Sequence, residues 1–459
     1  MGMDDGESCG KLSGRNQTET LLSGARESSS SRRIGRRVLL ELRARWAGVF
    51  PALVTAAGVY VVGAADGGFF PRIWRLTLFA LAVLTAAALV GRERLAFGRR
   101  EWIALAALAA FTAWVAASKY WSDRPSTSLL ESERSLLYVA CLAAVLVCVG
   151  RASLPQLLGG AVAGVTATCA YGLGDYVFSP PPLNPYQGRL LFEPLGYANA
   201  VGIYAALGIV LAVGLALWAR SWAGRALSLA PLAVLVPTLY LTSSRGAWVA
   251  LPVGILATLY LARRIRSRIA LLSLLAAGIA ASLVLGSVKG QAFSLVGPNR
   301  PHYWRVAWKD FEEHPLLGSG AGTYYDYWLR HRPIQEFVHD AHSLYVESLA
   351  ELGPFGLALL LIGLGLPLLG LRGRQDPVVA AAGGGYVAFL VHAGVDWDWE
   401  MPAVTLIGFL CAGAVLVGTR PQRAGISTPV RAALLVGALL LAVFALARLE
   451  STGGLGLRP

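Results

Sequence analysis

Charge is scarce in this sequence. Only 15% of its 459 residues are charged, whereas a soluble domain carries about 25%. With a hydrophobic fraction of 55%, this excludes an ordinary soluble domain and indicates a polytopic membrane protein. Cysteine is scarce too, and the five cysteines form neither a CxxC pair nor a Cys/His metal spacing. This excludes a disulfide framework, and we interpret the cysteines as small core residues.

Residues 1–45 lack an apolar segment, which argues against a cleavable signal peptide and predicts a disordered cytoplasmic tail. The formal net charge of +13 is typical of nucleic-acid-binding proteins. Here, however, the arginines occupy short loops between apolar runs, the pattern of topology determinants. We therefore expect the lipid bilayer as a partner and no nucleic acid.

About thirteen apolar runs follow the tail, and a membrane-spanning helix needs about 17–25 residues. They lie at 47–65, 73–90, 102–117, 135–149, 154–174, 197–218, 226–241, 247–262, 269–286, 345–371, 378–395, 402–418 and 430–447. The predicted fold is an all-α bundle of about 12–13 spans with one long loop that carries short helices. The predicted regions are a tail 1–45, membrane helices 46–286, a large loop 287–341, membrane helices 342–447 and a short tail 448–459.

The loops predict the orientation. If the N-terminus is cytoplasmic, the short arginine-rich loops GRERLAFGRRE, ARSWAGR, RRIRSR, LRGRQD and GTRPQR all fall inside the cell. The long, aromatic and acidic loops then fall outside, as the positive-inside rule requires. We expect a multi-pass protein of the plasma (inner) membrane whose large loop is extracytoplasmic.

The stretch from Pro298 to Gly353 holds five of the six histidines and four arginines. A membrane protein that collects these residues in one extramembrane loop is expected to do its chemistry there. Within the stretch, Trp304, Arg305 and Trp308 have the spacing of a short amphipathic helix. For Arg305, a surface ion pair with Asp310 or Glu312 is the alternative to a site. The run GSGAG lacks the strand and the Lys-Ser/Thr of a nucleotide site, so we interpret it as a turn.

His339 and His342 lie three residues apart at the start of a predicted helix that carries Glu347 and Glu351. A zinc site lacks a third ligand at a known spacing, and no HExxH is present. One histidine is better suited to act as a general base at neutral pH, while the alternative is a histidine that only hydrogen-bonds its own loop.

Arg245 stands in TSSRGAWVAL between small residues, at the end of a predicted helix. A guanidinium there suits phosphate oxygens, and an interfacial arginine is an equally good interpretation. Two further segments share this side of the membrane. One places Arg189 and Asn199 before and inside a span. The other is HAGVDWDWEMPA, with Asp396, Asp398 and Glu400 between tryptophans that we interpret mainly as membrane anchors. The alternative is that these carboxylates beside aromatic rings bind sugar hydroxyls.

Four segments together resemble the O-antigen ligase/polymerase superfamily of bacterial membrane glycosyltransferases. They are WSDRPSTSLLESERSLLYV, RLLFEPLGYANAVG, TSSRGAWVAL and the pair RVAWKDFEEHPLLGSGAGTY and HSLYVESLAELGPFGL. They run from about Trp121 to Leu357. One departure is Ser343, where the family usually has asparagine.

The resemblance implies an enzyme that transfers an undecaprenyl-diphosphate-linked glycan to a glycan, lipid or protein acceptor outside the plasma membrane. It maps the family's two arginines and one histidine onto Arg245, Arg305 and His342. We add Arg189, Asn199, His339 and Trp304 as predicted substrate-binding residues.

The implied chemistry is consistent with the residues. Two guanidinium groups can stabilise the leaving diphosphate and a histidine can deprotonate the acceptor, so we expect neither a cofactor nor a metal. No DxD-type motif stands in the large loop to suggest a nucleotide-sugar donor. Ligation and polymerisation both stay open, because they share this donor chemistry. The alternatives are a secondary transporter of envelope precursors, for which we find no convincing internal repeat, and a non-catalytic envelope scaffold.

Overall fold

The computed structural model describes residues 49–92, 95–179, 189–265, 272–273, 276–278, 280, 299–373, 375–421 and 425–452. The predicted tail 1–45, most of the predicted span 269–286 and residues 287–298 and 453–459 lie outside these ranges. The chain divides into two units, Met1–Pro51 and Ala52–Pro459, and the helical bundle with its candidate site belongs to the second.

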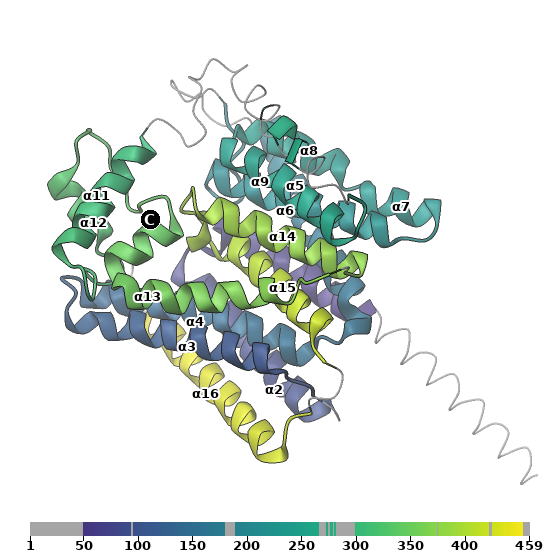
Figure 1. Cartoon of the computed structure of the whole chain (residues 1–459), viewed down its shortest axis with the longest axis horizontal. Helices are drawn as coiled ribbons and strands as arrows, with labels where there is room; N and C mark the ends of the chain where they lie inside the picture. The colour runs from purple at the N-terminus through teal and green to yellow at the C-terminus, as the bar shows by residue number, and fades with distance from the viewer. Residues whose placement is uncertain are drawn as a thin grey trace, which may run out of the picture. The chain divides into compact units, whose positions relative to one another are not determined.

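The described residues form mainly α-helices, with a few short 3-10 helices, one isolated antiparallel bridge between Ala96 and Gly425, and no strand among them (Figure 1). Besides a helix over Val49–Ala64, the principal helices are α2 (Pro71–Gly91), α3 (Arg99–Ala117), α4 (Pro125–Cys148), α5 (Leu154–Phe178), α6 (Ala198–Trp218), α7 (Trp222–Leu229), α8 (Leu232–Thr242), α9 (Arg245–Leu261), α11 (Arg300–Glu313), α12 (Tyr324–His331), α13 (Leu344–Leu369), α14 (Pro377–Ala393), α15 (Pro402–Thr419) and α16 (Thr428–Thr452). The predicted all-α class is confirmed.

Within the described part of the chain, eight helical segments are long and apolar enough to cross a membrane. Three shorter apolar helices, Val49–Ala64, Arg245–Leu261 and Pro377–Ala393, coincide with further predicted runs, and α4 coincides with another. The predicted multi-pass membrane protein is therefore confirmed. Proline at the first or second position begins α2, α4, α5, α14 and α15, since a helix start leaves that backbone N–H unpaired anyway.

The large loop carries two short helices, α11 and α12, as the sequence predicts. In Figure 1 they lie together beside the N-terminal half of α13. They have a small core of their own, formed by Tyr303, Ala307, Tyr324, Trp328, Val338, Ala341 and Ala350. The loop is thus a compact unit seated on the start of α13, and it holds whatever its side chains bind in a fixed place.

The glycine run between α11 and α12 is a turn, as the sequence predicts. Gly318, Gly320 and Gly322 all have positive φ angles, which glycine adopts without the steric cost of a side chain. A Cβ atom on Gly318 would lie 2.2 Å from the backbone carbon of Glu351, so the turn lies directly on α13. The Glu351 carboxylate accepts hydrogen bonds from the backbone N–H groups of Gly322 and Tyr324, both at 2.9 Å.

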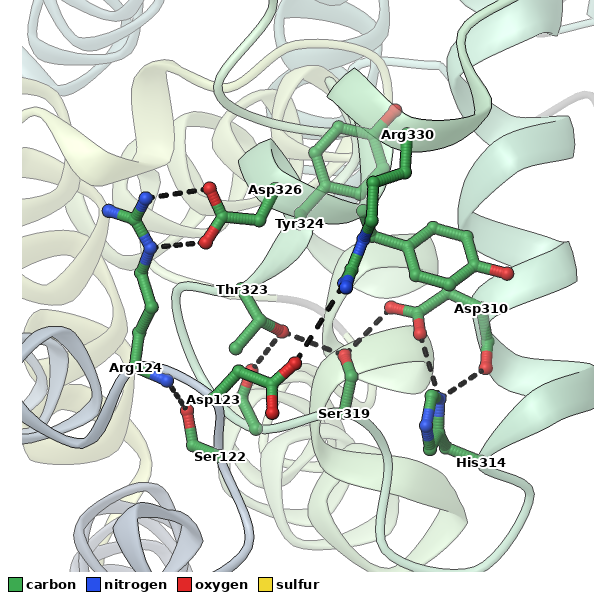
Figure 2. A network of polar contacts seen from close by, with 12 residues as sticks. Ser122, Asp123, Arg124, Asp310, His314, Ser319, Thr323, Tyr324, Asp326 and Arg330 are labelled. Carbon is green, nitrogen blue, oxygen red and sulfur yellow. Dashed lines mark hydrogen bonds and ion pairs between the residues drawn. The ribbon is translucent and has the colours of Figure 1, made fainter.

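A polar network fastens the turn to its surroundings (Figure 2). Asp310 accepts a hydrogen bond from Ser319 Oγ at 2.7 Å, and its other oxygen lies 3.0 Å from His314 Nδ1. Because the carboxylate stands between the hydroxyl and the imidazole, this is an anchor and not a Ser–His pair for nucleophilic catalysis. On the other side of the turn, Arg124 forms a two-pronged ion pair with Asp326, which ties the start of α4 to α12.

Candidate functional site

His342 lies between the large loop and α13 with φ +56°, a backbone conformation that is uncommon outside glycine and clusters at functional sites. Its Nδ1 lies 3.0 Å from the backbone carbonyl of Asp340. A carbonyl only accepts, so Nδ1 carries the proton and Nε2 keeps a lone pair. The ring packs against Tyr303, with centroids 5.0 Å apart. This geometry is that of a neutral imidazole with Nε2 as the available base.

Electrostatics keep that imidazole neutral. Burial lowers the pKa of His342 below its ordinary value, and the positive charge of Arg300 lowers it further. The Asp396 carboxylate and the bond to the Asp340 carbonyl oppose the shift without cancelling it. At neutral pH the side chain can therefore accept a proton.

Arg300, the first residue of α11, forms an ion pair with Asp396 from the loop between α14 and α15. Asp396 is 0% exposed and accepts hydrogen bonds from Tyr197 Oη at 2.9 Å and Asn199 Nδ2 at 2.8 Å. Burial raises the pKa of Asp396, but Arg300 and two histidines together hold it below its ordinary value. The predicted residue Asn199 thus meets the large loop through a carboxylate that was not predicted from the sequence.

Arg245 begins α9. The residue before it, Ser244, caps the helix by accepting a hydrogen bond from the Ala247 N–H at 3.3 Å. A Cβ on Gly246 would lie 2.9 Å from His392 Nε2, so the small residue lets α14 approach. The guanidinium lies near enough to Arg300 for their like charges to repel. The charge of Arg300 therefore acts on both Arg245 and His342.

The other predicted site residues lie elsewhere. Arg305 is exposed on α11 and has no ion pair or hydrogen bond with the described residues; Asp310 and Glu312 bond to His314 and Trp308 instead. Trp304 packs against the core of the loop. Arg189 is exposed.

His339 stacks on Tyr325 at 4.1 Å, whereas His342 packs on Tyr303, so the two histidines are held by different tyrosines. Both line a cavity of about 780 Å³. Its wall combines carboxylates and arginines from α4, α13 and the loop after α14 with aromatic and aliphatic side chains from the membrane helices.

Three carboxylates meet on that wall. Asp340, Glu347 and Glu400 each offer an oxygen within 4.8 Å of the other two, and among the described residues they could hold a cation. This cluster was not predicted from the sequence, because Glu400 joins it from a different loop. The proximity of the acids to tryptophans in DWDWE was the available signal.

Ser343, which stands where the family usually has asparagine, is the cap residue of α13. Its Oγ caps α13 by accepting a hydrogen bond from the Val346 N–H at 3.4 Å. Serine and asparagine are about equally good in this position. The helix start that follows His342 is therefore preserved without asparagine.

Comparison with known proteins gives one family match. A family model described as O-antigen ligase matches residues 230–361, which include α9, α11, α12 and the first part of α13. No curated protein matches the chain. The matched segment contains Arg245, Arg300, Arg305 and His342. The match supports the O-antigen ligase superfamily as the family of this membrane protein.

Proposed function

We propose that the protein transfers a glycan from a lipid-diphosphate donor to an acceptor hydroxyl on the extracytoplasmic face of the plasma membrane. The observation that carries the proposal is His342, a neutral base by geometry and environment, near Arg300, whose charge also acts on Arg245. A base and a pair of guanidinium groups are the parts that such a transfer requires.

The reaction balances with this chain's own groups. The acceptor oxygen forms a bond to the anomeric carbon and gives its proton to His342 Nε2. The bond from that carbon to the diphosphate breaks, and its electron pair leaves with the lipid diphosphate. Guanidinium groups stabilise the developing charge there, because their planar fork matches phosphate oxygens.

Two arginines of α11, Arg300 and Arg305, are candidates for the second diphosphate ligand. The resemblance maps it onto Arg305, which is exposed and stands about 140° around the helix from Arg300. The geometry favours Arg300, whose charge acts on both His342 and Arg245. We propose Arg245 and Arg300 as the diphosphate ligands and keep Arg305 as the alternative.

We further propose that transfer needs no metal ion, because the arginines already supply positive charge at the leaving group. Purified protein, a lipid-diphosphate glycan and an envelope extract from a strain lacking the protein should give transfer in excess EDTA. Loss of transfer that Mg²⁺ or Zn²⁺ restores would show that Asp340, Glu347 and Glu400 hold a required cation. In the deletion strain, accumulated full-length lipid-linked polymer would indicate a ligase, and accumulated single repeat units would indicate a polymerase.

The orientation of the protein in the membrane can be tested separately. Arg330 is exposed in the large loop and Arg220 is exposed between α6 and α7. With the N-terminus inside, a membrane-impermeant thiol reagent should label Arg330→Cys but not Arg220→Cys in intact cells, and both after lysis. The native protein is the background control. The reverse pattern would place the large loop in the cytoplasm and remove the proposed mechanism with it.

A further inference from the structure

The cavity beside His342 is unusually acidic. Six carboxylates line it against two arginines: Glu131, Glu336, Asp340, Glu347, Glu351 and Glu400, with Arg124 and Arg134. A lipid diphosphate is itself strongly anionic, so it fits the arginine side of His342 and not this wall. The cavity thus lies where the second substrate of the proposed transfer would approach the base.

Most of these charges are already engaged. Arg134 pairs with Glu131 and with Glu400, the latter at 2.8 Å. Arg124 is turned to Asp326, outside the cavity wall. These ion pairs neutralise part of the wall, but the carboxylates still outnumber the arginines.

Asp340 and Glu347 are among the carboxylates of this wall that have no ion pair with the described residues. Glu347 is 4% exposed and uses one oxygen to accept the Ala341 N–H at 2.7 Å, while its other oxygen has no hydrogen bond to the described residues. The Asp340 carboxylate accepts none from them either. The Glu400 carboxylate lies in the same cluster, so Asp340 and Glu347 stand in a locally negative environment. Their unpaired oxygens can accept hydrogen bonds from a ligand.

Two residues with unpartnered donors belong to the same wall. Trp74, 3% exposed, and Trp399 both line the cavity, and neither indole N–H has a hydrogen-bond partner among the described residues. The Arg134 guanidinium lies over both rings, at 5.6 and 5.8 Å. Buried donors usually find partners, so two unpartnered ones beside unpartnered acceptors indicate a polar ligand. Aromatic faces flanked by donors and carboxylates suit a sugar.

The wall changes character along α13. Glu347 belongs to its first turn, whereas Leu360 and Leu364 line the cavity beyond the kink at Gly353. Phe389 and Phe409 complete this apolar part. The clustered carboxylates Asp340, Glu347 and Glu400 therefore lie on the side of the kink that carries His342.

We infer that this cavity binds the acceptor, and that its free carboxylates select a sugar end that is neutral or carries an amino group and reject one that is anionic. The inference rests on the proposed function, because it takes His342 as the base toward which the acceptor hydroxyl points. A like charge placed against a buried carboxylate is strongly disfavoured, whereas hydroxyl and ammonium groups supply the donors that Asp340 and Glu347 lack.

Three soluble trisaccharides of different charge test this. Binding of chitotriose (cationic), triacetylchitotriose (neutral) and trigalacturonate (anionic) to the protein in lipid nanodiscs is measured by calorimetry. We expect the first two to bind at least about tenfold more tightly than the third. Glu347→Gln and Asp340→Asn should reduce that ratio to about threefold or less. Glu312→Gln, an exposed acid outside the cavity, should leave it unchanged.

Three outcomes would overturn the inference: no binding by any trisaccharide, equal binding of trigalacturonate, or a ratio that both cavity variants leave intact. Binding that requires added Mn²⁺ would instead make the cluster a cation site and overturn it as well. The expected order without any glycan transfer would leave the acceptor cavity standing and remove the proposed function. Glycan transfer without the expected order of binding would remove the acceptor cavity and leave the proposed function standing.

Discussion

His342→Asn should lower glycan transfer by about 10²- to 10⁴-fold, the usual contribution of a positioned general base, while the protein stays folded. Asparagine is chosen to replace His342 because the backbone conformation at this position tolerates it. It tolerates the positive φ of +56° better than alanine does, and its amide can donate to the Asp340 carbonyl. It cannot take a proton from an acceptor.

The measurement is the transfer rate beside donor binding and melting temperature. Donor binding should change little, because the base acts on the acceptor. His339→Asn is the matched control: His339 lines the same cavity, but its ring stacks on Tyr325, and we expect a milder effect. Near-normal transfer by His342→Asn would remove it as the base and leave His339 as the candidate.

The pH profile of the native protein supplies an independent test. Because the folded-state pKa of His342 is lowered, the neutral base persists below its ordinary pKa of 6.5. Transfer should therefore stay constant as the pH falls through 6.5 and decline only in more acidic buffer, with the acid limb set by His342 protonation. An acid limb centred well above 6.5 would contradict the assigned environment.

The fold was largely predictable because its determinants are local. Apolar runs longer than a dozen residues can hide their backbone polar groups only as helices in a bilayer, so hydropathy alone places them. The turn at Gly318–Gly322 was likewise predictable, since its glycines supply positive φ angles that other residues resist. α11 begins at Arg300 and contains the predicted amphipathic run.

The site was predictable only where a single segment carries it. His342 stands out by its own motif, but Arg300 meets Asp396 across 96 residues, and Glu400 reaches Asp340 from a separate loop. Periodicity along one helix says nothing about such partners. The anchor role of the tryptophans around Asp396 stays a prediction, while the full burial of Asp396 and its bond to Asn199 could not be predicted from this segment.

Which arginine of α11 serves the reaction is decided by paired lysine substitutions. Arg300→Lys keeps the positive charge that Asp396 needs, since a buried carboxylate left unpaired would cost about 3–5 kcal/mol. It removes the planar guanidinium that can form a two-pronged contact with phosphate. We expect Arg300→Lys and Arg245→Lys each to lower transfer roughly 100- to 1,000-fold, equivalent to about 2.7–4 kcal/mol of lost transition-state stabilisation. Arg305→Lys, on the exposed side of the same helix, should stay near the native rate.

The same assay as for His342, with melting temperatures alongside, separates the interpretations. A large loss for Arg305→Lys with a native rate for Arg300→Lys would support the resemblance over the geometry and make Arg300 a structural partner of Asp396. Parallel losses of yield and melting temperature in all three variants would support a scaffold instead of an enzyme. Arg300→Ala sharpens the distinction: if the arginine acts on both the fold and the diphosphate, alanine should lower stability and rate together, whereas lysine lowers the rate alone.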